Sequence, residues 1–315
     1  MRLQRQRGFR ARATAVAVTV TLASVVVAGC GEVKNTITPK KGTANQVTVV
    51  LAGPPNGLYA GLYEARALGY FAQNDIDVHI VSPGAGQDPV SMVHGGQALL
   101  GISSEPSVLL HRNEDEAVAA VGAIVHVPLP AITIPVPKPS SSGGKAVTTT
   151  PTNNHRKTTT TTTTTTKPTT TTVSAPDATL WPASLQQLLS QSGAPTYDGL
   201  VVVARKGTIV EHAGLLRRFV QTLAHGYRAA RGDPRQAINK LVAAVPALSA
   251  TKALQLATLE AALPDMFPAG AKIWGWQREA EWNTFGTWMT THHLLSNPNA
   301  ITDASTNELL QGQGV

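Results

Sequence analysis

Residues 47–55 read VTVVLAGPP, an apolar run that ends in one glycine and two prolines. Val and Thr are branched at Cβ and favour strands, whereas Gly and Pro end regular structure, so the run predicts a buried strand followed by a turn. Further apolar segments predict a helix over 58–68 and strands over 76–80, 98–103 and 117–127. Strands that alternate with short helices in this way predict an α/β unit with a largely parallel sheet.

Polar residues mark where the next helices begin. Asp88, which precedes Pro89, and Ser104 each offer a side-chain oxygen that can cap a helix N-terminus. Beyond residue 178 we predict a strand over 199–204 and then helices over 211–231, 234–245 and 249–262, and around Trp282, Phe285 and Met289. The helix over 211–231 has apolar residues at helical spacing, which predicts one buried face. These residues are Leu216, Phe219, Val220, Leu223 and Tyr227.

The N-terminus has the order of a secretory leader: arginines, an uncharged apolar stretch over 13–29, and small residues before Cys30. Cys30 is the only cysteine, which predicts lipid attachment there, as in a bacterial lipoprotein. An uncleaved membrane helix and a buried structural cysteine are the alternatives, although a spanning helix needs ~20 apolar residues. We expect a signal peptide over 1–30, a flexible tether over 31–46, and a protein lipid-anchored at the extracytoplasmic face of the cell membrane.

Charge and composition exclude several classes of function. The net charge of +7 comes largely from the arginines of the leader. No clustered basic face is visible in the remainder, so nucleic-acid binding is not expected. A single cysteine leaves no thiol pair for a disulfide or a cysteine zinc site. Four histidines have no Asp, Glu or Cys at the spacing of a metal site, so they are interpreted as surface or capping residues and no metal is predicted. They are His94, His111, His292 and His293.

Residues 140–174 are mostly Thr, with an unbroken run over 158–166. Such a segment has almost no apolar side chain to bury, so it cannot offset the entropy lost on ordering. We therefore predict a disordered Thr-rich insert over 138–177, with the composition of an O-glycosylated stalk.

Several short motifs, taken in order, resemble one family. They are residues 56–62 (NGLYAGL), 68–71 (LGYF), 77–78 (DV), 83–89 (PGAGQDP), 101–105 (GISSE), 193–198 (GAPTYD), 219–230, 274–277 (WGWQ) and 306–308 (TNE). The chain resembles the solute-binding proteins of ABC transporters that are related to thiamine pyrimidine synthase and to sulfonate, taurine and nitrate binders. The resemblance implies an α/β fold of periplasmic-binding-protein type 2, in which two lobes close on a solute by a hinge.

The resemblance also implies which residues bind the solute. They are Asn56, Tyr59, Gly84, Gly86, Gln87, Ser103, Ser104, Glu105 and Trp181. Asn56 would form hydrogen bonds, and Tyr59 would offer a flat ring to a pyrimidine. Each has a structural alternative: an ordinary turn for Asn56, a connecting loop for Gly84 and Gly86, and helix capping for Ser103 and Ser104. The four tryptophans at 274, 276, 282 and 288 suggest an aromatic cage, but packing of helices is favoured.

The chain departs from the family in its second lobe. The expected α/β segment is replaced by the Thr-rich insert, and after Trp181 no acid appears before Asp198. The resemblance therefore implies a first lobe begun over 47–137, a remnant of a truncated second lobe over 178–198, and a mainly helical return to the first lobe over 199–315. A lobe this small is below the size that sustains its own core.

Three functions are compared. The first is capture of a small solute, such as a thiamine-precursor pyrimidine, by a monomeric lipoprotein that delivers it to an ABC permease. The second is a degenerate paralogue serving as a surface lipoprotein with a Thr-rich display or interaction segment. The third, an enzyme of the thiamine-pyrimidine-synthase type, requires a cysteine-rich motif that the chain lacks, so no catalytic residue and no cofactor are predicted.

Overall fold

The computed structural model describes residues 44–135, 170–191 and 193–311. The predicted leader, Cys30, most of the tether and most of the Thr-rich insert lie outside these residues. Within them, five strands form one sheet in the order β2-β1-β3-β7-β4. The strands are β1 (Asn45–Val50), β2 (Ile76–Val81), β3 (Leu100–Ser103), β4 (Val118–Val125) and β7 (Leu200–Arg205). The tether predicted over 31–46 is too long by at least two residues, because Asn45 and Gln46 pair with β2 as the start of the first strand.

Four of the five strands run in the same direction. β1 is parallel to β2 and β3, while β7 lies between β3 and β4 and is antiparallel to both. The largely parallel sheet predicted from the sequence is therefore present, with one reversed strand that the sequence did not reveal. Because β7 is antiparallel to its neighbours, its first residues lie beside the last residues of β3 and β4 at one end of the sheet.

The predicted helix caps are present. The carboxylate of Asp88 accepts hydrogen bonds from the backbone N–H groups of Val90 (2.7 Å) and Ser91 (2.9 Å) at the start of α3 (Pro89–His94). Ser104 caps α4 (Glu105–Asn113), where its Oγ accepts from the N–H of Ser107 at 3.4 Å. These caps place the first turn of α4 at the end of β3.

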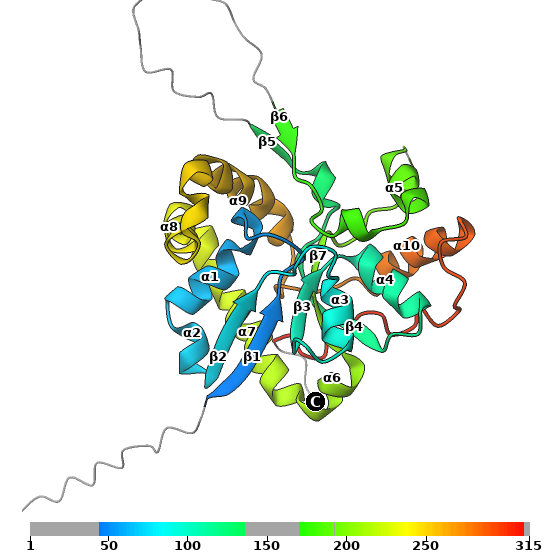
Figure 1. Cartoon of the computed structure of the whole chain (residues 1–315), viewed down its shortest axis with the longest axis horizontal. Coiled ribbons are helices and arrows are strands. Elements are labelled where there is room, and N and C mark those ends of the chain that lie inside the picture. Colours follow the sequence, from blue (N-terminus) through cyan, green and yellow to red (C-terminus); the bar gives the residue numbers. More distant parts are fainter. Residues whose placement is uncertain (1–43, 136–169, 192, 312–315) are drawn as a thin grey trace, which may run out of the picture. The chain divides into compact units, whose positions relative to one another are not determined.

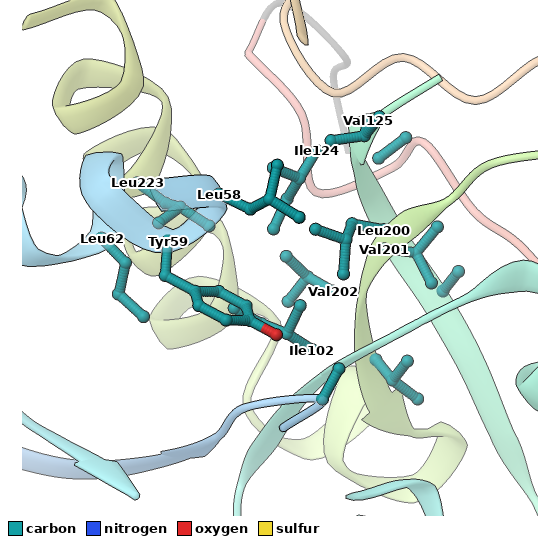
Figure 2. Packing of buried hydrophobic residues seen from close by; sticks show 14 of the residues in the cluster. Leu58, Tyr59, Leu62, Ile102, Ile124, Val125, Leu200, Val201, Val202 and Leu223 are labelled. Atoms are coloured by element: carbon teal, nitrogen blue, oxygen red, sulfur yellow. The ribbon is translucent and has the colours of Figure 1, made fainter. Parts of the chain in front are cut away.

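The main core lies between the sheet and a layer that includes α1 (Ala60–Ala67) and α7 (Ala213–Gly232). The predicted apolar face of α7 is buried along its length. Figure 2 shows side chains from β3, β4 and β7 meeting Leu58, Tyr59 and Leu62 beneath α7, which contributes Leu223. α3 covers the opposite face, where its Val93 packs with Val50.

Close approach of α1 and α7 depends on glycine. A Cβ atom at Gly226 would overlap the carbonyl oxygen of Gly61 and lie 2.5 Å from the Cβ of Ala65. A Cβ atom at Gly61 would in turn strike the ring of Tyr227. The two helix backbones therefore touch, which fixes the position of the loop between β1 and α1.

The other elements complete the α/β fold, with helices on both sides of the sheet (Figure 1). They are η1 (Gly57–Tyr59), α2 (Tyr70–Gln73), η2 (Leu129–Ala131), β5 (Thr133–Pro135), β6 (Thr170–Thr172), η3 (Ala178–Leu180), α5 (Ala183–Ser190), α6 (Lys206–Glu211), α8 (Pro234–Ala244), η4 (Pro246–Thr251), α9 (Lys252–Met266) and α10 (Glu279–Thr291). No helix in the described ranges is both long enough and apolar enough to cross a bilayer.

The boundary predicted for the disordered insert needs correction. Thr170–Thr172 forms β6, which pairs with β5 in an antiparallel hairpin near the end of the sheet toward which β1 points (Figure 1). Val173, Ala175 and Asp177 are buried. Ordered structure therefore resumes by residue 170 rather than 178. Val173 and Ala175 are buried in the core and Asp177 is hydrogen-bonded, and the composition of the segment does not reveal these tertiary contacts.

Candidate functional site

Buried polar groups gather where β3 ends and β7 begins. Ser103 closes β3, Ser104 caps α4, and Glu105 is the first residue of that helix. All three side chains are fully inaccessible to solvent. Buried polar groups require partners, so the contacts of these three residues define the site.

Asp177 supplies the first set of partners. Its Oδ2 accepts hydrogen bonds from Ser103 Oγ (2.9 Å), Ser104 N (3.0 Å), Ser104 Oγ (2.7 Å) and Ser107 Oγ (2.8 Å). The carboxylate thus sits at the N-terminus of α4, where the helix dipole favours negative charge. Pro176 lies against Gly53, where a Cβ atom would be 2.7 Å from the Cβ of Pro176. We call these residues, Ser103, Ser104, Ser107 and Asp177, the serine seat.

Glu105 and Asp198 form the second set. The N–H of Asp198 donates to Glu105 Oε2 at 2.8 Å, and the N–H of Glu105 donates to the carbonyl oxygen of Asp198 at 3.0 Å. The carboxylate of Asp198 accepts from Trp282 Nε1 at 2.9 Å and lies 3.2 Å from His126 Nδ1. This exchange joins the start of α4 to the residues that lead into β7.

Burial shifts the proton equilibria of these groups. Desolvation raises the pKa of Glu105 well above its usual range, and the nearby charge of Asp198 raises it further. Burial also raises the pKa of Asp177, although the three serine hydroxyls oppose that shift. The pKa values of Tyr59 and Tyr197 are raised by burial and by the charge of Asp177. Two acids and two phenols therefore lie close enough to influence one another.

Three polar atoms of this site have no hydrogen-bond partner among the described residues: Tyr59 Oη, Asp177 Oδ1 and Glu105 Oε1. The backbone amides of Ala52 and Gly53 lie near enough to lower the pKa of Tyr59, but they form no hydrogen bond with it. Asp177 Oδ1 can accept a hydrogen bond, whereas the raised pKa of Glu105 favours its protonated form, which donates, and the hydroxyl of Tyr59 can donate or accept.

Aromatic rings border the same region. Trp181 donates from Nε1 to Ser107 Oγ at 2.7 Å, and its ring centroid lies 6.5 Å from that of Tyr197 in an edge arrangement. Tyr197 also contacts Phe285, with ring centroids 4.8 Å apart. The segment that includes η3 thus places Trp181 against the serine seat.

The predicted site residues fall into two groups. Ser103, Ser104, Glu105 and Trp181 come together as described above. The hydroxyl of Tyr59 belongs with them, but its ring is packed in the core against the strands and offers no free face for stacking (Figure 2).

The remaining predicted residues form local turns. The Oδ1 of Asn56 accepts from Leu58 N at 2.9 Å and caps η1, as the structural alternative proposed. Gly84, Gly86 and Gln87 form an exposed turn after β2, in which Gln87 Oε1 accepts from Gly84 N at 2.7 Å. No hydrogen bond between described residues joins this turn to the serine seat.

Sequence reasoning missed Asp177, Ser107, Tyr197 and Asp198. The resemblance places an acid after the aromatic residue, whereas here Asp177 precedes Trp181 by four positions. The acid expected after Trp181 is absent, and the buried carboxylate of Asp177 reaches the same serine, Ser107, from the other side in the sequence. The motif PDATLW, residues 176–181, carried the signal. Its acid lies beside apolar residues, and an acid that is buried with them requires hydrogen-bond partners.

Two further interpretations are tested. His111 is neither a surface nor a capping residue, since its Nε2 lies 2.9 Å from Asp88 Oδ1 and its Nδ1 lies 3.2 Å from Glu116 Oε2. The tryptophans form no cage. Trp274 stacks on Tyr227, Trp282 is buried and Trp288 stacks on Phe285, which confirms packing for these three, while Trp276 is 39% exposed. The described residues contain no cluster of acid, His or Cys side chains suited to a metal ion.

Residues 56–177, which are less than half of the chain, match the model of the NMT1/THI5-like family. A curated relative is the formylaminopyrimidine-binding protein of Halalkalibacterium halodurans, which is 39% identical over 83 residues. That match covers 26% of this chain and 25% of the relative, so it spans about a quarter of either protein.

Two solved structures are similar to the chain at low identity, and the first of them shares its fold. A protein from Bordetella bronchiseptica RB50 has a TM-score of 0.52 and 13% identity, over 85% of this chain and 96% of that one. The alkanesulfonate-binding protein SsuA from Xanthomonas axonopodis pv. citri, bound to MOPS, has a TM-score of 0.48 and 13% identity, over 83% and 98%. The α/β fold predicted from the sequence is confirmed, and it is shared with the Bordetella bronchiseptica protein.

Proposed function

We propose that the protein is an extracytoplasmic solute-binding lipoprotein of an ABC transporter that captures an aminopyrimidine of the thiamine-precursor type. It acts as a monomer, is held at the membrane by acylated Cys30, and passes its solute to a permease. The family match and the name of the H. halodurans relative support the class of solute.

The unused hydrogen-bonding capacity of the site carries this proposal. Asp177 Oδ1 is buried and unpaired among the described residues and suits an N–H group of an amino substituent, while the carboxyl group of Glu105, whose raised pKa favours the protonated form, suits a ring nitrogen. The hydroxyl of Tyr59 suits a ring nitrogen, and Trp181 with Tyr197 provides the aromatic surroundings of a flat heterocycle. A sulfonate or nitrate would meet the buried carboxylate of Asp177 in a region of low dielectric, which is unfavourable.

Entry of a solute requires movement, because the serine seat and Glu105 are closed to solvent. The segment from Val173 to Trp181 carries Asp177 and lies across the end of β3. We infer that this segment moves away from α4 to admit the solute and returns over it. This movement of the segment would close the site over the solute, as the second lobe does in two-lobed binding proteins.

Binding is tested by thermal unfolding of the full chain with 4-amino-5-hydroxymethyl-2-methylpyrimidine and with its formylamino analogue. A solute at a hundred times its Kd adds about 2.7 kcal/mol to the unfolding free energy, which raises Tm measurably. Asp177→Asn should abolish the shift, because it places an amide N–H group where Oδ1 accepts, whereas Asp77→Asn, at an exposed acid on β2, should retain it. A shift with taurine or nitrate, or none with either pyrimidine, would refute the proposed solute.

The anchor is tested separately by fractionating cells that express the wild-type chain or Cys30→Ala. Lipid attachment predicts that the wild type sediments with membranes and that its mature N-terminus carries acyl mass. The variant should be released. Equal distribution of the two proteins would contradict the lipoprotein assignment.

A further inference from the structure

A second site lies outside the serine seat. Two adjoining cavities of about 420 and 200 Å³ share His126, Lys272 and Ile273 in their lining. They run between the last turns of α7 and the loop that joins α9 to α10. None of the residues predicted to bind the solute lines either cavity. We call this pair of cavities the basic groove.

The basic groove is lined by cations and by no acid. Arg228 and Arg231 come from α7, and Lys272 and Arg278 come from the loop. Arg278 pairs with Glu281 at 2.7 Å, but the ion pairs of the described residues include no partner for the other three cations. Cations gathered in one concavity create a positive potential that favours an anionic ligand.

An aromatic surface borders the cations. Trp276 lines the larger cavity and is 39% exposed, which few large apolar side chains in the described part of the chain are. The guanidinium of Arg231 lies over the ring of Phe267 at 4.1 Å from its centroid. An indole left partly open beside cations is suited to stacking a flat ring that carries negative charge.

The loop that forms the groove is fixed to the sheet at both ends. Before it, the N–H of His126 donates to the carbonyl oxygen of Asp265 at 3.1 Å. Near its end, the N–H of Ala123 donates to the carbonyl oxygen of Gly275 at 2.9 Å, and Gly275 has a φ of 87°. A site held in this way needs little ordering when a ligand binds.

We propose that the basic groove binds a small organic anion that joins a flat ring to a phosphate or sulfonate group. Arg228 and Lys272 neutralise the anionic group, and Trp276 stacks on the ring. This site is distinct from the serine seat, since none of the residues of the seat lines the groove. His126 lies between the two, because it lines both cavities and its Nδ1 is 3.2 Å from Asp198 Oδ1.

Isothermal titration of the full chain with phenyl phosphate tests the site, and inorganic phosphate and phenol report the two halves of the ligand. Phenyl phosphate should bind more tightly than either, and its Kd should rise with salt. Arg228→Gln combined with Lys272→Gln should weaken binding at least tenfold. Arg235→Gln, which removes an exposed charge on α8, should leave Kd unchanged.

Trp276 determines the preference for a ring. Trp276→Leu should bind phenyl phosphate and inorganic phosphate alike, whereas Trp276→Phe should keep most of the preference. Asp177→Asn should bind phenyl phosphate as the wild type does, which separates this result from failure of the pyrimidine site. Absence of binding at millimolar phenyl phosphate, or equal weakening by Arg235→Gln, would overturn the proposal.

Discussion

Replacement of Asp177 by alanine should loosen the segment that covers the end of β3. The substitution leaves Ser104 N and three serine hydroxyls without the acceptor that all four share. The hydroxyls can turn toward other groups, but the backbone N–H cannot. A buried donor without a partner costs about 1–3 kcal/mol.

The magnitude follows from these contacts. Hydrogen bonds to a charged acceptor contribute about 1.5–3 kcal/mol each, or roughly 6–12 kcal/mol for the four. Burial of the carboxylate costs several kcal/mol in the opposite direction. The expected net loss in unfolding free energy is about 3–5 kcal/mol, which for a domain of this size lowers Tm by roughly 6–20 °C.

Asparagine provides the matched comparison. Asp177→Asn keeps an acceptor oxygen toward the serines and removes a charge whose burial is unfavourable, so it should change the unfolding free energy by no more than about 1 kcal/mol at neutral pH. Because burial raises the pKa of Asp177, wild-type stability should fall as pH rises above the usual range of an aspartate, and Asp177→Asn should remove that part of the slope.

The assay is calorimetric unfolding of the full chain, with limited proteolysis to locate the loosened segment. Asp77→Ala, at an exposed site on β2, should change stability by less than about 0.5 kcal/mol. If Asp177→Ala unfolds as the wild type does, the serine seat does not hold the segment. If alanine and asparagine are equally destabilising, the argument from shared hydrogen bonds is wrong.

Three other changes test the remaining framework. Gly226→Ala should destabilise by more than about 2 kcal/mol because its methyl group would strike the α1 backbone, whereas Gly232→Ala, with open space around it, should not, as chemical denaturation would show. His111→Gln should reduce stability by up to about 1 kcal/mol between the usual pKa values of Asp and His, and less above pH 8, because the raised pKa of His111 and the lowered pKa of Asp88 strengthen their pair only while both are charged. Tyr227→Phe should cost about 1 kcal/mol in thermal unfolding through loss of the 2.8 Å bond to a carbonyl oxygen of η1.

Much of the fold was predictable because local chemistry and tertiary packing agree. Asp88 and Ser104 cap the helices that their positions indicate, and α7 buries the face that its spacing defines. The reversed β7 was not predictable, because its all-buried pattern is the same in a parallel or an antiparallel strand. The direction of β7 depends on how the chain returns to the sheet after α5, and no local sequence pattern indicates this path.

The site was predictable only in part. Ser103, Ser104 and Glu105 follow from their place at the end of a strand, and Trp181 from the resemblance. Asp177 lies 70 or more residues from the serines that it contacts, so no sequence spacing could connect them. Composition also hid it, because the Thr-rich tract suggested that order would return only later.

The hairpin of β5 and β6 gives the Thr-rich tract an unusual point of attachment. Pro135 pairs with Thr170, so the chain leaves and re-enters the domain at neighbouring positions about 5 Å apart. Because these two ends already meet, a foreign module whose own termini lie close together could be joined at Pro135 and Thr170 without drawing the strands apart, which makes this pair of strands a natural place to graft cargo.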